Sequence, residues 1–228
     1  MFWSFCSAKG GIGTSLIAAS VAQQLAVDTT TLLVDLGDDL PDLLGLEVSD
    51  RPGIRDWLIA DDEVDHRSLL DLAEPVVDGL HLLRSGGPHE LSSVSAARLL
   101  DAASATAGAF EVVVADLGVV HGGPFDPSVV LAAGGDRTSL VVRACYLALR
   151  RSSRISIDID DVIEVVEGGR ALQTVDIEAV FGQPVAARVP VDPAIARAAD
   201  AGLLATRTPR SLRRALARLV DDARSLAA

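Results

Sequence analysis

Lysine, cysteine and aromatic residues are scarce in this chain. Among its 228 residues there are two cysteines, and aromatic residues make up only 4 %. Cys6 and Cys145 have neither the spacing of a metal site nor that of a disulfide framework, so we expect buried thiols in a reducing compartment. With so few aromatic residues, the 49 % of the chain that is hydrophobic is mainly aliphatic. It suffices for the core of one domain over residues 1–228.

Long hydrophobic runs and excess positive charge are also missing. No apolar run approaches the roughly 20 residues that a membrane span needs, and no secretion signal precedes the first expected strand. The net charge of −12 argues against non-specific binding of nucleic acid by the surface as a whole, so no nucleic-acid partner is expected. The absence of a G-x-S-x-G motif argues against nucleophilic-hydrolase chemistry. We therefore expect a cytoplasmic protein of another class.

The sequence alternates regularly between apolar, strand-like runs and helix-like stretches. The pattern predicts seven strands, at residues 1–6, 30–35, 79–84, 110–116, 140–144, 162–166 and 184–189. It predicts helices at residues 16–26, 52–59, 91–105, 175–181, 194–201 and 211–226. Near-continuous apolar strands separated by helices are typical of a parallel sheet covered on both faces. We predict an α/β fold with a mostly parallel sheet of about seven strands and helices on both faces.

The single lysine, Lys9, lies in the glycine-rich run SAKGGIGTS, between the first expected strand and the first expected helix. A strand, a glycine loop and a helix in this order form a phosphate cradle, in which backbone N–H groups and the helix N-terminus face the anion. The alternative is a flexible turn that contains a lysine by chance. The order of the elements favours the cradle.

Acidic residues close two of the expected strands. Asp35 ends the second strand, and Asp116 ends the strand at residues 110–116. Ligands of parallel α/β sheets bind at the carboxyl ends of the strands, and an acid there can hold Mg²⁺ opposite a phosphate loop. A turn or helix-cap acid is the alternative for each residue alone. Their occurrence at the same edge as the Lys9 loop favours a binding site.

The run KGGIGTS resembles the deviant phosphate loop of the MinD/ParA class of P-loop ATPases, usually written KGGxGK[ST]. The resemblance covers nearly the whole chain. LLVDLGD is similar to the first switch of that class, EVVVADLG to its second switch, and residues 175–192 to its last helix and strand. The combination looks most like the CpaE/TadZ branch, whose members help to place pilus and secretion machinery.

The resemblance implies a P-loop NTPase fold, ATP or ADP with Mg²⁺ as cofactor, a homodimer, and pilus or secretion proteins as partners. In that class the early lysine, here Lys9, reaches across the dimer interface to the partner's nucleotide. The nucleotide-binding residues would be Lys9, Gly10, Gly11, Ile12, Gly13, Thr14 and Ser15. Ser15 and Asp116 would hold Mg²⁺, while Lys9, Asp35 and Asp38 would carry any hydrolysis.

The departures from the class pattern concern hydrolysis. Thr14 stands where the class has the loop lysine that contacts the β- and γ-phosphates, and a hydroxyl cannot supply that charge. The class usually reads Asp-x-Asp in the first switch, whereas here Asp38 comes one place late, and either Asp38 or Asp39 is the stand-in. The base-reading asparagine is also missing, because Val166 is followed by Glu167. Hydrolysis is therefore expected to be weak or lost.

The last expected helix, at residues 211–226, carries apolar residues on one face and arginines beside it. Two interpretations are open: a helix packed on the sheet, or a surface helix that touches the membrane and recruits the protein to the membrane or a cell pole. It lacks Phe and Trp and contains Asp221 and Asp222, which favours packing.

Three functions remain open. The first is a dimeric localisation or assembly factor that binds nucleotide and has degenerate catalytic motifs. The second is a slow but active ATPase with a nucleotide-driven cycle between monomer and dimer. The third is a structural adaptor that binds no nucleotide.

Overall fold

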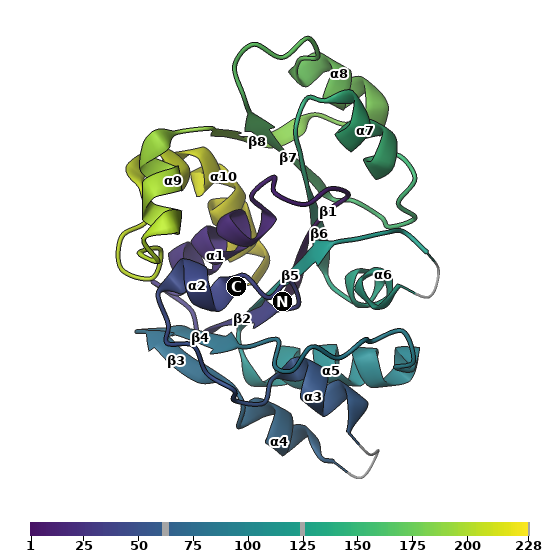
Figure 1. The fold of residues 1–228 in the computed structure, drawn as a ribbon, viewed down its shortest axis with the longest axis vertical. Helices are drawn as coiled ribbons and strands as arrows, with labels where there is room; N and C mark the ends of the chain where they lie inside the picture. Colours follow the sequence, from purple (N-terminus) through teal and green to yellow (C-terminus); the bar gives the residue numbers. More distant parts are fainter. Residues whose placement is uncertain (61–63, 124–125, 228) are drawn as a thin grey trace.

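Eight strands form one sheet in the computed structural model, which describes residues 1–60, 64–123 and 126–227 (Figure 1). The strands are β1 (Phe2–Ser7), β2 (Thr31–Asp35), β3 (Glu74–Val77), β4 (Leu80–Leu83), β5 (Val112–Val119), β6 (Arg137–Val142), β7 (Asp161–Val166) and β8 (Val185–Pro190). Their order across the sheet is β3-β4-β2-β5-β1-β6-β7-β8. Every pair is parallel except β3 with β4. The predicted fold class is confirmed.

Helices cover both faces of this sheet. They are α1 (Thr14–Leu25), α2 (Leu40–Leu44), α3 (Ile54–Ile59), α4 (His66–Leu70), α5 (Ala96–Ala109), α6 (Pro127–Ala133), α7 (Tyr146–Ser152), α8 (Thr174–Phe181), α9 (Pro193–Asp200) and α10 (Arg210–Ala227). Buried residues of α1, α2, α9 and α10 pack on one face, and those of α3 to α8 pack on the other (Figure 1). The sheet is the middle layer of three.

The side chains of each strand alternate between the two faces of the sheet and so contribute to the hydrophobic core on each face. In β1, Trp3 and Phe5 join the core under α1 and α10, while Phe2 and Cys6 join the opposite core. Successive side chains of a strand point to opposite faces, so a strand buried on both sides is apolar throughout. This is why the apolar runs predicted the seven strands well.

The eighth strand, β3, was not predicted. It is short, includes Glu74 and Pro75, and pairs only with β4, in antiparallel register. Proline cannot donate to a ladder and is therefore confined to edge strands. A half-polar edge strand has no continuous apolar signal, and the same is true of the short helices α2, α4, α6 and α7, which the sequence pattern also missed.

Helix α10 packs its apolar face against the rest of the molecule. Its residues Leu212, Leu216, Leu219, Val220 and Ala223 are all buried in the core that also contains α1 and β8. The packed interpretation of the C-terminal helix is therefore the one that the structure supports. No helix of the described ranges has the length and hydropathy needed to cross a bilayer.

Truncating this packed face should be costly. Leu216 is completely buried, so we expect Leu216→Ala to lower the free energy of unfolding by about 2–5 kcal/mol. Leu226→Ala on the same helix is the matched control, because Leu226 is 69 % exposed, and its effect should stay within about 0.5 kcal/mol. Denaturant unfolding measures both. Equal effects of the two variants would contradict the packing of α10.

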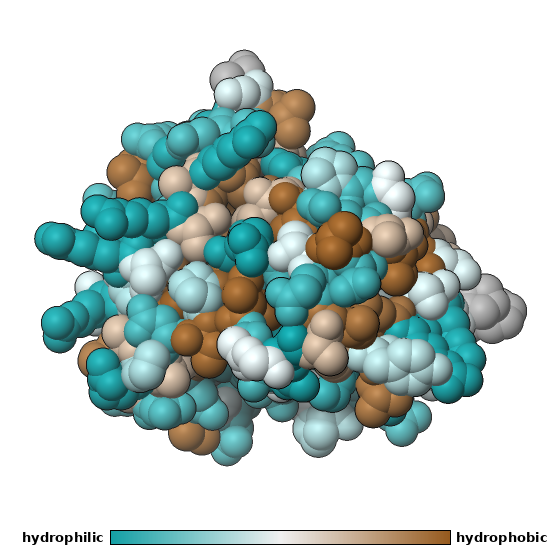
Figure 2. All heavy atoms as spheres, turned by 90° about the horizontal axis from the view of Figure 1, so that it is seen from above, coloured by the Kyte–Doolittle hydropathy of each residue, from teal (hydrophilic) through white to brown (hydrophobic). Residues whose placement is uncertain are grey.

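Exposed apolar side chains occur at the end of the molecule that carries α7 and α8. They include Tyr146 and Leu147 on α7, and Val175 and Val180 on α8. Figure 2 views the molecule from this end and shows hydrophobic groups interrupted by hydrophilic ones. The surface of the described residues at this end is therefore mixed in character.

Candidate functional site

The glycine-rich run forms a tight loop between β1 and α1. The Ser7 hydroxyl donates to the Lys9 carbonyl at 3.2 Å, and Gly11 and Gly13 adopt φ values of 70° and 95°. Glycine takes this left-handed conformation without the strain that a Cβ would add. The first α-helical hydrogen bond runs from the Ile17 N–H to the Gly13 carbonyl at 3.0 Å. The loop thus leads directly into the N-terminus of a 12-residue helix.

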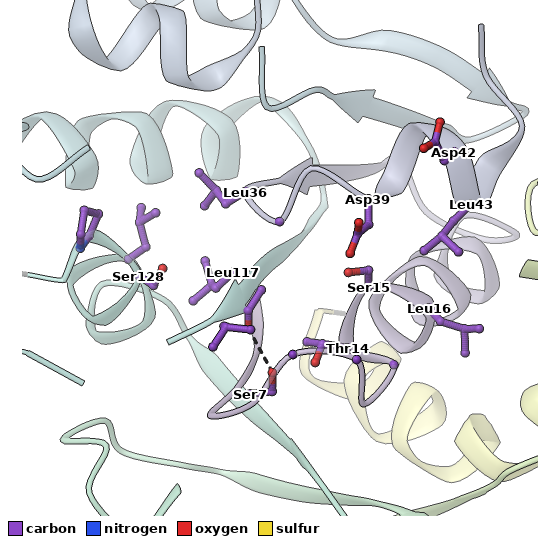
Figure 3. A pocket seen from close by; sticks show the side chains of 18 of the residues that line it. Ser7, Thr14, Ser15, Leu16, Leu36, Asp39, Asp42, Leu43, Leu117 and Ser128 are labelled. Atoms are coloured by element: carbon purple, nitrogen blue, oxygen red, sulfur yellow. Dashed lines mark hydrogen bonds between the residues drawn. The ribbon is translucent and has the colours of Figure 1, made fainter. Parts of the chain in front are cut away.

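The loop opens on a cavity of about 990 Å³. A Cβ built on Gly11 or Gly13 would meet no atom within 4 Å, so the backbone of the loop faces free space. In Figure 3, Leu36, Leu117 and Ser128 lie on one side of the cavity, while Leu16, Asp42 and Leu43 lie on the other. A loop of free backbone groups with the positive end of a helix dipole suits a phosphate group.

Thr14 and Ser15 begin α1, and both are buried and line the cavity. Ile12, the apolar residue of the loop, is buried in the core instead. The structure therefore brings the glycines, Thr14 and Ser15 together at one wall, as the sequence predicts. Lys9 is only partly buried, and its charge acts on Glu167, in the loop after β7.

Asp35 ends β2, whereas β5 continues past Asp116 to Val119, beyond the predicted end of that strand. The two aspartates lie opposite one another in the register of β2 with β5. The side chain of Asp35 accepts backbone N–H groups from Gly37 at 3.0 Å, Asp38 at 2.7 Å and Leu40 at 3.3 Å, which shapes the turn after β2. Burial, followed by the charge of Asp116, raises the pKa of Asp35 to about 7. Asp35 is thus the residue that holds the turn after β2 in place.

Asp116 is completely buried and has a free oxygen. Its Oδ1 accepts the Gly118 N–H at 3.0 Å, whereas Oδ2 accepts no hydrogen bond from the part of the chain that the structure describes. Burial raises the pKa of Asp116 to about 6, against the lowering effect of the nearby Ser15 hydroxyl and the Gly118 N–H. A buried carboxylate oxygen without a donor is costly unless a cation or a bridging water reaches it. This fits the magnesium role predicted for Asp116 with Ser15.

The turn after Asp35 separates the two candidate acids. Asp38 has a φ of 71°, and its side chain accepts a hydrogen bond from the buried hydroxyl of Ser85, in the segment after β4. Asp39 lines the cavity instead, and its side chain and that of Ser15 point toward one another (Figure 3). The structure therefore places Asp39, rather than Asp38, beside the phosphate loop.

Sequence reasoning missed the loop that forms the far wall of the cavity. Asp56 on α3 accepts the N–H groups of Gly53 at 2.7 Å and Gly87 at 3.0 Å, and pairs with His89 at 2.9 Å. These partners outweigh the effect of burial and lower the pKa of Asp56. They tie the segment that carries His89, Glu90 and Leu91 to the cavity. The signal was Asp56 three residues after Gly53, in the first turn of α3, where an acidic side chain can accept the N–H of the residue that precedes the helix.

Two arginines of the cavity wall were also missed as site residues. Arg55 on α3 lines the cavity and donates to the Leu36 carbonyl at 2.8 Å. Arg143 follows β6 and lines the cavity near Gly10 and Gly11. Only the register of the sheet distinguishes Arg143 from the other arginines that follow it in the sequence.

Comparison with known proteins identifies the fold. No family model and no curated protein sequence matches the chain. Among solved structures, a ParA family ATPase from Chlorobium tepidum TLS is 23 % identical with a TM-score of 0.77, over 96 % of this chain and 98 % of that one. The septum site-determining protein MinD of Pyrococcus horikoshii OT3, complexed with Mg-ADP, is 18 % identical with a TM-score of 0.81, over 99 % and 96 %.

A complex of the cell division proteins MinC and MinD from Aquifex aeolicus also contains a similar chain. It is 19 % identical with a TM-score of 0.74, over 99 % of this chain and 95 % of that one. The fold of this chain is that of the MinD/ParA P-loop ATPases.

Proposed function

We propose that this chain is a MinD/ParA-like nucleotide-binding protein with degenerate catalytic motifs. It acts as a dimeric localisation or assembly factor for a pilus or secretion system, as in the CpaE/TadZ branch. The observation that carries the proposal is the loop from Gly10 to Ser15, which opens on the cavity. Behind it lies the buried Asp116, near the Ser15 hydroxyl, with one carboxylate oxygen that has no donor among the described residues. This arrangement provides for a phosphate and a cation side by side.

The cofactor is ATP or ADP with Mg²⁺. Backbone N–H groups of the glycine loop and the N-terminus of α1 bind the phosphates, and Thr14 contributes its hydroxyl. The Ser15 hydroxyl and Asp116 hold Mg²⁺. The described residues contain no cluster of three or more His, Cys, Asp or Glu that would hold a metal alone. Mg²⁺ is usually bound by one or two protein groups together with phosphates and water.

Hydrolysis is weak in this proposal because two catalytic groups are altered. Thr14 brings no positive charge to the phosphates, and electrostatic stabilisation is the main catalytic device of phosphoryl transfer. Asp38, the predicted stand-in for the second switch acid, has its side chain engaged with Ser85. The protein therefore senses nucleotide more than it consumes it.

The dimer is proposed from Lys9. Its side chain is partly exposed at the edge of the site, which supports reach toward the nucleotide of a second copy. The partners proposed from the resemblance are pilus or secretion proteins, in the cytoplasm at the membrane or a cell pole. Because the apolar face of α10 is buried, we assign such recruitment to protein partners rather than to that face.

A slow, active ATPase is the second candidate, and the position of Asp39 favours it. Asp39 lines the cavity and points toward Ser15, so it can order a water near the γ-phosphate (Figure 3). Turnover then drives a cycle between monomer and dimer. The third candidate, an adaptor that binds no nucleotide, leaves the free oxygen of Asp116 without a role.

ATP turnover and oligomeric state distinguish the first two candidates. We expect wild-type protein with Mg–ATP to form dimers with only marginal turnover. Lys9→Ala should reduce the dimer fraction. Light scattering and a phosphate-release assay measure both, with Arg151→Ala on the exposed end of α7 as the control. Brisk turnover that Lys9→Ala abolishes would favour the active ATPase.

A further inference from the structure

Arg143 stands beside the glycine loop because of the sheet register. Strands β1 and β6 are parallel neighbours, with Cys6 opposite Leu140. The loop that begins after Ser7 and the segment that begins after Val142 therefore leave the sheet side by side. The Arg143 side chain lines the same cavity as Gly10 and Gly11.

The cavity needs positive charge for an anionic ligand. The acids Asp39, Asp42, Glu90 and Asp200 line it, whereas its arginines are Arg55 and Arg143. A triphosphate with four surrounding carboxylates meets repulsion unless cations offset it. Within the loop, the Thr14 side chain contributes no positive charge.

Of these two arginines, Arg143 is the one beside the glycine loop, and its guanidinium makes no short hydrogen bond within the described residues. The guanidinium of Arg55 is engaged with the Leu36 carbonyl at 2.8 Å. Arg143 makes only a long ion pair, with Nη1 3.7 Å from Glu167 Oε2, and its side chain is 27 % exposed. In both arginines the buried Nε has no hydrogen-bond partner within the described ranges, so the two differ in their other contacts and in their distance from the loop. A buried guanidinium N–H without an acceptor is costly, and beside the loop a phosphate oxygen of a ligand can accept from it.

Glu167 lies among three cations at this edge. Arg170 donates to Glu167 Oε2 from Nε at 3.0 Å and also from Nη2. Its hydrogen bonds, and then the charges of Arg170, Arg143 and Lys9, lower the pKa of Glu167. Glu167 is therefore an anion that pairs with Arg143 at long range and lies within the electrostatic reach of Lys9. Arg170 keeps it in place from the solvent side.

We propose that Arg143 supplies the positive charge to the nucleotide phosphates that Thr14 does not, and that Glu167 is its counter-ion in the absence of nucleotide. This inference rests on the proposed nucleotide binding. The guanidinium fork suits phosphate oxygens because it offers two parallel N–H donors. Binding of a phosphate exchanges the long contact with Glu167 for charge-assisted hydrogen bonds.

Calorimetric titration of Mg–ATP, Mg–ADP and AMP tests this exchange. Arg143→Gln should weaken Mg–ATP binding roughly 10- to 100-fold, the range of a lost hydrogen bond to a charged group, and should weaken AMP binding less. Arg143→Lys should retain part of the affinity. Arg150→Gln is the matched control, because Arg150 lies on α7 against Tyr146 and away from the cavity.

Glu167→Gln tests the counter-ion and keeps the inference falsifiable if Arg143→Gln does not fold. It should tighten Mg–ATP binding about 3- to 10-fold in the wild type and have little effect in the Arg143→Gln background, since coupled residues are not additive. An equal gain in both backgrounds would assign the effect to Lys9 and overturn the role of Arg143.

The outcomes separate this inference from the function on which it rests. If the wild-type protein binds neither Mg–ATP nor Mg–ADP, the proposed function fails. If the wild type binds both and Arg143→Gln binds Mg–ATP equally well, the function stands and the role of Arg143 is overturned. Thermal unfolding of each variant shows whether its fold is intact.

Discussion

Replacing Thr14 with lysine is expected to tighten Mg–ATP binding roughly 10- to 100-fold, the range of a new charge-assisted hydrogen bond. Thr14 is the first residue of α1, is buried, and lines the cavity beside the glycines, so a lysine there reaches the same space as the phosphates. Titration calorimetry of wild type and variant measures the change. Thr14→Gln, which is long and uncharged, is the control and should produce no gain.

The same variant tests two parts of the account at once. An unchanged affinity would count against placing Thr14 at the position of the missing lysine. If Arg143 already supplies part of the charge, Arg143→Gln should cost less in the Thr14→Lys background than in the wild type, because the two cations serve one ligand.

The second large effect concerns Asp116, whose carboxylate is completely buried and has one oxygen without a donor in the part of the chain that the structure describes. We expect Asp116→Asn to raise the free energy of unfolding by on the order of 2–3 kcal/mol at pH 8 without nucleotide. The asparagine keeps an acceptor for the Gly118 N–H and removes a buried charge near Asp35. The same change should abolish the dependence of ATP binding on Mg²⁺.

The sign of the pH dependence follows from the raised pKa of Asp116. Its pKa is about 6 in the folded protein against an ordinary value of 3.8, so between these values the folded state holds more protons than the unfolded state. The wild type therefore loses stability as the pH rises through this window. The gain from Asp116→Asn should be largest above pH 7 and approach zero near pH 4.

Urea denaturation at several pH values measures this profile. Asp42→Asn is the matched control: Asp42 lines the same cavity but is exposed, so the free energy of unfolding should hardly change. If Asp116→Asn were destabilising at pH 8, or if its effect were independent of pH, the buried carboxylate would not carry the cost assigned to it.

Much of the fold was predictable because strands that are buried on both faces of the sheet have continuous apolar sequences. The runs that contain Trp3, Leu33 and Val114 are examples, since each strand supplies both cores. The edge strand β3 was not predictable in this way, because it contains Glu74 and Pro75 and packs on one neighbour only.

The site was predictable where chemistry and chain order coincide, as in the loop from Gly10 to Ser15. The site was not predictable where the position of a side chain depends on a partner that is distant in the sequence. Asp38 and Asp39 are equivalent in sequence, and the contact with Ser85, 47 residues away, directs Asp38 away from the cavity. Arg143 is one of several arginines in its stretch, and only the pairing of β1 with β6 places it at the loop.

The central claim is that this chain binds a nucleoside phosphate with magnesium at the glycine loop. Titration of Mg–ATP into the purified wild-type protein, repeated with EDTA, tests it most directly. The account predicts saturable binding that ADP competes for and that weakens when Mg²⁺ is removed. Absence of binding at millimolar ATP by a folded protein would contradict the account and leave the structural adaptor as the function.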